Sequence, residues 1–234
     1  MQLFFHRDIK TDKMLPESEA VHCTKVLRKS VGDEINVIDG QGYLYTCVIT
    51  NTSKKTCEVE IKHEEYFENN LPHINLLIAP TKNAERIEWF AEKAVETGVS
   101  QITIILTDNT ERKKFNMDRL EKKIVSASKQ ARRFHIPTLV GPEKLENIFN
   151  ISVNKNQQNF ICYVEEHQPD HLYNKIEVGS DINILIGPEG DFSKEEYNLA
   201  IKSGYIPVSL GDFRLRTETA GLAAIQMAVL KNSI

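Results

Sequence analysis

Two short loops contain residues whose types and spacing could hold and activate a small ligand. The first runs Leu185-Ile186-Gly187-Pro188-Glu189-Gly190-Asp191-Phe192-Ser193 and follows an apolar run. Its glycines allow a ligand to approach the backbone closely, and Pro188 stiffens the turn. Ligands of α/β proteins bind at loops that leave the carboxyl ends of strands. The loop is therefore either a ligand cradle or simply a tight strand-to-helix turn.

The second loop combines arginines with a hydroxyl- and carboxylate-bearing helix start. It runs Leu210-Gly211-Asp212-Phe213-Arg214-Leu215-Arg216-Thr217-Glu218-Thr219-Ala220. Thr217, Glu218 and Thr219 suit a helix N-terminus, where oxygens meet free N–H groups and the positive end of the dipole. Packing explains Arg214 and Arg216 poorly, so we expect them to face an anion or a polarised carbonyl. Glu218 fits either a reactive carboxylate or a purely helix-stabilising one.

Several common chemistries are not indicated. The sequence has no G-x-G-x-x-G, no phosphate-binding G-x-x-x-x-G-K-[ST] and no G-x-S-x-G nucleophile motif. Its four cysteines form no C-x-x-C pair, and we expect them to be reduced and packed as small apolar groups. Pro169 separates His167 from His171, so no metal site is expected.

Composition favours a folded, water-soluble protein. The 234 residues are 41 % hydrophobic and 26 % charged, and no apolar run approaches the ~18 residues of a membrane helix. The N-terminus is charged and lacks the apolar stretch of a signal peptide, so a cytoplasmic location is expected.

Charge is distributed unevenly around a net value of −4. Between Arg112 and Arg133 there are nine lysines and arginines, opposed only by Asp118 and Glu121. Such a basic segment on an acidic chain can bind a polyanion locally. A solvated helix face would explain the same pattern, and charge alone does not separate the two.

The first 70 residues are predicted to be rich in β-structure. Alternating polar and apolar residues favour three strands, and turn residues separate them; the strands are Glu34–Asp39, Tyr43–Thr50 and Cys57–Ile61. Glu17–Lys29 is compatible with one helix, and Glu64–Pro72 with a linker. Short strands in so short a segment predict a small barrel, better suited to binding than to catalysis.

From His73 onward, strands and helices alternate, which predicts an α/β domain with a mainly parallel sheet. The predicted strands are Ile74–Ala79, Ile102–Leu106, Phe160–Val164, Asn183–Ile186 and Ile206–Leu210. Helical spacing follows Ile87 up to Gly98, and a second helix lies within the basic segment. Ser193–Ser203 begins with a Ser193/Glu196 capping box, and Ala220–Leu230 forms a final apolar helix.

The two loops, in this order and spacing, resemble those of the SPOUT methyltransferases. More narrowly, the chain resembles the family that methylates N3 of a uridine in 16S ribosomal RNA of the small subunit. Further matches extend over nearly the whole chain: His22-x-x-x-Val26-Leu27-Arg28, Gly32-Asp33, Asp39-Gly40-x-Gly42, Lys82, Arg86, Glu96, Gly98, Gln130-x-x-Arg133 and Pro137. Asp191 departs from the family pattern, where a second glycine is common, and Phe213 stands where arginine is frequent.

The resemblance implies a PUA-like RNA-binding β-barrel over residues 1–70 and a SPOUT domain with a deep trefoil knot over 73–234. It also implies S-adenosylmethionine as cofactor, no metal, and a homodimer, for which Ala220–Leu230 is either a dimer surface or a core helix. The residues expected to hold the cofactor are Leu185, Ile186, Gly187, Pro188, Glu189, Gly190, Leu210, Gly211, Leu215, Arg216, Thr217, Thr219 and Ala220.

For the reaction, we expect Arg216 to favour the uridine N3 anion, with Glu218 or a water near Thr219 taking the proton. The residues expected to bind 16S rRNA are Arg7, His22, Lys25, Arg28, Lys82, Arg86, Arg112, Arg132 and Arg133. Three alternatives remain: methylation at another RNA position such as a ribose 2′-hydroxyl, a non-catalytic RNA-binding assembly factor, and an unrelated α/β nucleotide-binding enzyme.

Overall fold

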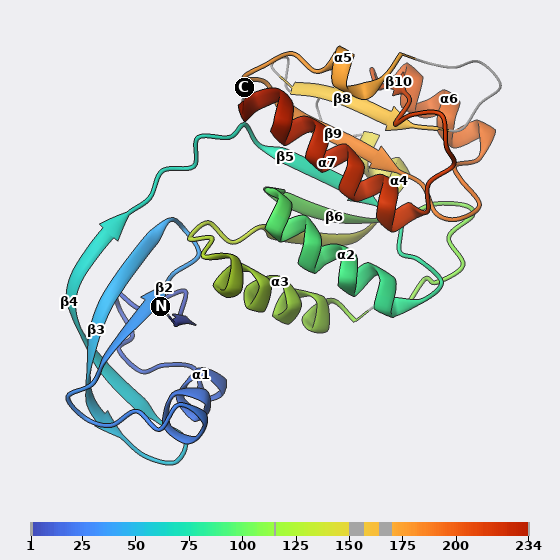
Figure 1. Cartoon of the computed structure of the whole chain (residues 1–234). Coiled ribbons are helices and arrows are strands. Elements are labelled where there is room, and N and C mark those ends of the chain that lie inside the picture. The colour runs from blue at the N-terminus through green and yellow to red at the C-terminus, as the bar shows by residue number, and fades with distance from the viewer. Residues whose placement is uncertain (1, 115, 150–156, 164–169, 234) are drawn as a thin grey trace. The chain divides into compact units, whose positions relative to one another are not determined.

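A computed structural model describes residues 2–114, 116–149, 157–163 and 170–233 (Figure 1). The chain divides into two compact units. The first unit contains Met1–Asn70 together with Val125–Ile136, and the second contains Leu71–Ile124 and Pro137–Ile234. A cut at one point in the sequence therefore does not separate the units, because the segment Val125–Ile136 returns to the first.

The first unit is built on a four-stranded sheet in the order β1-β2-β3-β4. Its strands are β1 (Leu3–Phe5), β2 (Glu34–Ile38), β3 (Tyr43–Thr52) and β4 (Cys57–Tyr66). Only β1 and β2 are parallel. Beyond β4, the Leu15 N–H donates to the Cys57 carbonyl and the Val59 N–H to the Lys13 carbonyl. In place of the predicted small barrel, the structure has a four-stranded sheet. The N-terminal segment pairs at both of its ends, as β1 with β2 and through residues 13–15 with β4.

Two predictions for this unit were wrong in detail. The predicted helix Glu17–Lys29 is a short α-helix, α1 (Glu17–Val21), continued by a π-helical turn, η1 (His22–Val26). It stops before Lys29 because Arg28 takes a left-handed backbone conformation, with φ of 55°. The predicted linker begins later, since β4 continues to Tyr66 by pairing with Tyr43 of the long strand β3.

A core of apolar side chains lies beneath this sheet, and three cysteines belong to it. Cys23, Cys47 and Cys57 are buried free thiols, as predicted. Burial raises the pKa of Cys47 to about 11, so the thiol remains protonated and unreactive at neutral pH. The hydroxyl of buried Tyr45 donates to Asp39 Oδ2 at 3.0 Å, which satisfies the polar end of the largest core side chain.

The second unit contains a fully parallel six-stranded sheet in the order β10-β8-β9-β5-β6-β7, which confirms the predicted α/β class. The strands are β5 (Ile74–Ile78), β6 (Gln101–Leu106), β7 (Thr138–Lys144), β8 (Gln157–Cys162), β9 (Asp181–Ile186) and β10 (Ile206–Val208). The helices are α2 (Ala84–Thr97), α3 (Met117–Ala131), α4 (Leu145–Phe149), α5 (Leu172–Lys175), α6 (Lys194–Lys202) and α7 (Thr217–Ser233).

Several element ends differ from prediction. The sequence did not predict β7, because this edge strand is polar and only partly buried. β10 stops at Val208, two residues before the predicted end at Leu210, and the predicted end of β8 at Val164 lies outside the described residues. Gly98 ends α2 in a left-handed conformation, and the Ser193/Glu196 capping box begins α6; both predictions are confirmed.

Helices cover both faces of this sheet (Figure 1). Alternation along β5 sends Leu77 into a core with α4 and α6, while Leu76 and Ile78 face α7. α7 approaches this face closely because Gly221 has no side chain. A Cβ atom at Gly221 would lie 2.7 Å from Cε2 of Phe90 in α2 and 3.0 Å from Cδ2 of Leu76.

We therefore expect Gly221→Val to destabilise the protein by about 1–3 kcal/mol, the usual cost of overpacking a core. Urea unfolding followed by circular dichroism measures this free energy. Gln226→Val is the matched control, because Gln226 is exposed on the same helix. Equal midpoints for the two variants would show that α7 does not need the close approach at Gly221.

Candidate active site

Four loops meet at the carboxyl edge of the parallel sheet. They follow β5 (residues 79–83), β6 (107–112), β9 (187–193) and β10 (209–216). Parallel strands present all their carboxyl ends at one edge, which is where open α/β sheets bind ligands. Both loops that the sequence indicated are among the four.

Hydrogen bonds join these loops. The Thr217 hydroxyl donates to the Gly187 carbonyl at 3.1 Å, which links the two predicted loops directly. The Asn109 side-chain amide donates to the carbonyls of Gly190 and Asp191 at 3.1 and 3.0 Å. From the loop after β5, the Lys82 N–H donates to Glu189 Oε1 at 3.1 Å. The loop after β9 (residues 187–193), called the cradle below, is thus held by hydrogen bonds from the start of α7, the loop after β6 and the loop after β5.

The loop after β9 leaves little space for side chains at its glycines. A Cβ at Gly187 would lie 3.0 Å from Asp191 Oδ1, and one at Gly190 would lie 3.3 Å from Asn109 Cβ. Asp191 itself has φ of 60°, a conformation that glycine favours and aspartate tolerates. Its Oδ1 accepts from the Phe192 N–H at 2.8 Å. Asp191 therefore takes a backbone conformation that a glycine would also adopt at this position.

A pocket of about 370 Å³ lies between the beginnings of α2 and α7. Its lining residues are Asn83, Glu85, Arg86, Trp89, Arg216, Glu218 and Thr219. The sequence indicated Arg86, Arg216, Glu218 and Thr219 for function. It missed Trp89, although this single tryptophan stands one helical turn after Arg86 and is 47 % exposed.

Glu218 is the most unusual group in this pocket. The residue is 6 % exposed, and its Oε1 lies 3.8 Å from Arg86 Nε. Among the described residues, its buried Oε2 has no hydrogen-bond partner. A buried carboxylate oxygen without a donor is costly, so Glu218 Oε2 is available to a water, a ligand or a proton. Arg216 is exposed at the same pocket.

The remaining predicted cofactor residues fall into two environments. Leu185, Ile186 and Pro188 are buried, whereas Leu210, Leu215 and Ala220 are partly exposed. Gly211 is exposed, and the neighbouring Phe213 is 87 % exposed. The predicted residues thus extend from the end of β9 into the loop after it, and from the loop after β10 into the first turn of α7.

The residues predicted to bind RNA lie in both units. Lys82, Arg86 and Arg112 belong to the second unit, where Lys82 Nζ pairs with Glu111 at 2.6 Å. The others belong to the first unit, and they are Arg7, His22, Lys25, Arg28, Arg132 and Arg133. Arg132 is exposed, whereas Arg133 is partly buried, and burial lowers the pKa of Arg133 to about 10. Arg132 is therefore the better placed of this pair for an external anion.

Over the described ranges, no three His, Cys, Asp or Glu side chains cluster closely enough to hold a metal ion, and His167 lies outside those ranges. None of the helices described is both long and apolar enough to cross a membrane.

A fully parallel α/β unit with loops meeting at its carboxyl edge, joined in one chain to a separate β-rich unit, defines the class of this protein as a two-unit α/β protein. The chain belongs to the RNA methyltransferase family: residues 68–229 match the RNA methyltransferase domain, and residues 15–62 match the RNA methyltransferase PUA domain. It is thus a methyltransferase with a PUA-like N-terminal domain.

Individual relatives place the chain among the proteins named ribosomal RNA small subunit methyltransferase E. The protein of that name from Buchnera aphidicola is 32 % identical, over 93 % of this chain and 87 % of the relative. A crystal structure titled probable rRNA-methyltransferase from Porphyromonas gingivalis has 38 % identity and a TM-score of 0.90, covering 97 % of this chain and 96 % of the other. The Neisseria gonorrhoeae methyltransferase E structure, bound to S-adenosyl methionine, has 26 % identity and a TM-score of 0.83, covering 96 % and 95 %.

Proposed function

We propose that this protein transfers a methyl group from S-adenosylmethionine to N3 of a uridine in 16S ribosomal RNA. The observation that best supports this is the junction of the cradle with the pocket. Thr217 bonds to Gly187 of the cradle, and the next residue, Glu218, lines the pocket with Arg216. A donor held in the cradle would thereby lie beside side chains able to act on an acceptor.

The residues present fit this cofactor. Gly190 is exposed, whereas Gly187 is buried and its carbonyl accepts from the Thr217 hydroxyl. The backbone N–H and carbonyl groups of this loop are suitable partners for an adenine and a ribose. We assign its binding to the predicted residues along the loops after β9 and β10, from Leu185 to Gly190 and from Leu210 to Ala220. When bound, S-adenosylmethionine supplies a methyl group on a positively charged sulfonium, which becomes neutral on transfer.

The demanding step is activation of the acceptor, since the N3–H of uridine is a weak acid. The Arg216 guanidinium would stabilise the negative charge that spreads onto the uracil carbonyl oxygens as the proton leaves. Glu218 Oε2, which lacks a donor among the described residues, would accept that proton directly or through a water near Thr219. Arg86, 3.8 Å from Glu218, would hold the carboxylate in place.

N3 lies on the Watson–Crick edge, so the target base must be unpaired or flipped out to react. We propose that the first unit, as a PUA-like RNA-binding domain, and the basic segment Arg112–Arg133 hold the surrounding 16S rRNA within the small subunit. A ribosomal substrate implies that the enzyme acts in the cytoplasm.

We expect Arg132→Glu to weaken RNA binding and to lower the slope of log Kd against log salt concentration by about one per lost phosphate contact. Fluorescence anisotropy over a salt titration measures both. Lys54→Glu makes the same charge change at an exposed turn in the same unit. Identical slopes for Arg132→Glu and wild type would mean that the Arg132 region is only a solvated surface.

The deep trefoil knot is also part of the proposal. β10 lies at an edge of the sheet, whereas α7, which follows it, packs against β5 and β9 in the middle. This path from the edge of the sheet to its middle supports the proposal, as does the Thr217–Gly187 hydrogen bond between the start of α7 and the loop after β9.

We further propose a homodimer formed through α7 and the adjoining part of α2. α7 is apolar around most of its circumference. In the single chain, the apolar side chains of Leu230 in α7 and Trp89 in α2 are exposed, and a partner chain could cover them. Light scattering is expected to give twice the 26.7 kDa mass of one chain. A monomeric mass at micromolar concentration would exclude this arrangement.

The function is tested by incubating unmodified small ribosomal subunits with labelled S-adenosylmethionine and identifying the labelled nucleoside by mass spectrometry. Label in N3-methyluridine is expected. Label in a 2′-O-methyl nucleoside would keep the methyltransferase but change the target position. No label despite cofactor binding would exclude this substrate.

A further inference from the structure

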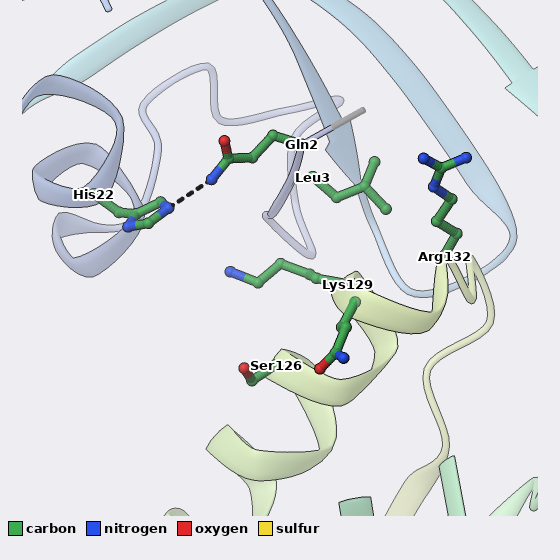
Figure 2. A pocket seen from close by; sticks show the side chains of 7 residues that line it. Gln2, Leu3, His22, Ser126, Lys129 and Arg132 are labelled. Carbon is green, nitrogen blue, oxygen red and sulfur yellow. Dashed lines mark hydrogen bonds between the residues drawn. The ribbon is translucent and has the colours of Figure 1, made fainter. Parts of the chain in front are cut away.

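The first unit contains a second, larger pocket that the proposed methyl transfer does not use (Figure 2). It has a volume of about 710 Å³. One wall comes from the N-terminal segment and η1, and the other from the end of α3. Its lining residues are Gln2, Leu3, His22, Ser126, Lys129, Gln130 and Arg132. All of these residues belong to the first unit.

Neutral hydrogen-bonding groups dominate this lining. The amides of Gln2 and Gln130, the Ser126 hydroxyl and the His22 ring can all donate or accept, which suits the mixed edge of a nucleobase. Gln2 Nε2 and His22 Nε2 are 2.9 Å apart, so these two groups hold each other at one side of the pocket (Figure 2). The His22 ring also lies edge-on to Phe4, at 6.1 Å between centroids.

The two cations of the pocket are not equivalent. Lys129 Nζ forms an ion pair with Glu19 Oε1, which fixes the ammonium and cancels much of its charge. Arg132 has no ion pair or side-chain hydrogen bond among the described residues, and its side chain lies over the Leu3 side of the pocket (Figure 2). A site for a free polyanion would keep both cations available. One free guanidinium beside neutral polar groups instead suits one phosphate joined to one base.

We propose that this pocket binds a single unpaired nucleotide of an RNA strand, with its phosphate on Arg132 and its base among Gln2, His22 and Gln130. The proposal rests on the proposed function only in taking RNA as the partner. About 710 Å³ is within the range of small-ligand sites and large enough for a nucleotide. A base stacked within a duplex cannot enter such a pocket, so single-stranded RNA is the form recognised.

The test measures binding of a fluorescein-labelled 20-nucleotide single-stranded RNA, and of the same strand in a duplex, by anisotropy. Ser126→Phe fills the pocket without changing charge. It is expected to weaken single-strand binding about tenfold, to leave duplex binding within about twofold, and to lower the salt slope of single-strand binding by about one, because the phosphate contact with Arg132 is lost with the base. Gln130→Ala, which adds no bulk, is expected to weaken single-strand binding about threefold. Thr50→Phe, on the exposed side of β3, is the matched control and is expected to match wild type.

Different failures have different meanings. If Ser126→Phe and Gln130→Ala bind the single strand as tightly as the wild type does, the pocket is not the nucleotide site. The proposed function would still stand. Tight binding of free uridine monophosphate, displacing the labelled strand at micromolar concentration, would assign the pocket to a free nucleotide and overturn the strand proposal. A wild-type enzyme that neither binds RNA nor methylates small subunits would overturn the proposed function itself.

Discussion

Replacing Arg216 with alanine is expected to lower the turnover number of methyl transfer about 100- to 1,000-fold. Removing one preorganised group that stabilises developing negative charge has costs of this size in other enzymes. Arg216 lines the pocket with Glu218 and is exposed toward solvent, so its loss should not disturb the fold. We expect the affinity for RNA to stay within about threefold of wild type, because the guanidinium acts on the charge that develops on the uracil. The affinity for S-adenosylmethionine should fall less than the rate, because Arg216 is one of several residues assigned to the cofactor.

Single-turnover methylation of small subunits, with separate binding measurements, checks this expectation. Lys202→Ala is the control, because Lys202 is an exposed cation at the end of α6 in the same unit and does not line the pocket. Arg216→Lys should recover part of the rate, since it keeps the charge without the planar fork of donors. Full turnover in Arg216→Ala, with normal binding, would remove this arginine from the mechanism.

Glu218→Gln is expected to lower the single-turnover rate about 100-fold or more, the usual contribution of a positioned acid or base. The amide has nearly the shape of the carboxylate but cannot take a proton from N3. Glu218 is 6 % exposed, and its Oε2 lacks a partner among the described residues, so the variant isolates charge and basicity from packing. The loss should appear in the rate at saturating RNA, and less in RNA affinity.

Glu85→Gln provides the control, since Glu85 lines the same pocket but is exposed. If Glu218→Gln instead shifts the unfolding midpoint and leaves the rate of the folded enzyme unchanged, the carboxylate only supports the start of α7. Comparing the rates of Arg86→Gln and Glu218→Gln separates two roles: Arg86 holds the Glu218 carboxylate in place, and Glu218 accepts the proton. Arg86→Gln should reduce the rate less, because it leaves the acceptor oxygen in place.

Most of the α/β architecture follows from local patterns in the chain. The apolar runs of β5, β6 and β9 are buried by helices on both faces, so their sequences contain few polar positions and identify them as parallel strands. Ser193 and Gly98 mark helix ends through capping and left-handed geometry, which depend only on neighbouring residues. β7 carries no such signal, since it lies at a sheet edge and pairs on one side only.

The sequence by itself determined the two loops of the site and the residue types in them, because turn chemistry and helix-start chemistry are local. Only the tertiary structure decided that Thr217 bonds to Gly187, that Glu218 is buried beside Arg86, and that Trp89 lines the pocket. It likewise decided that Val125–Ile136 returns to the first unit and forms a pocket with His22. These relations join residues far apart in the chain, and pairing of that kind depends on packing between elements, which no local pattern of residues encodes.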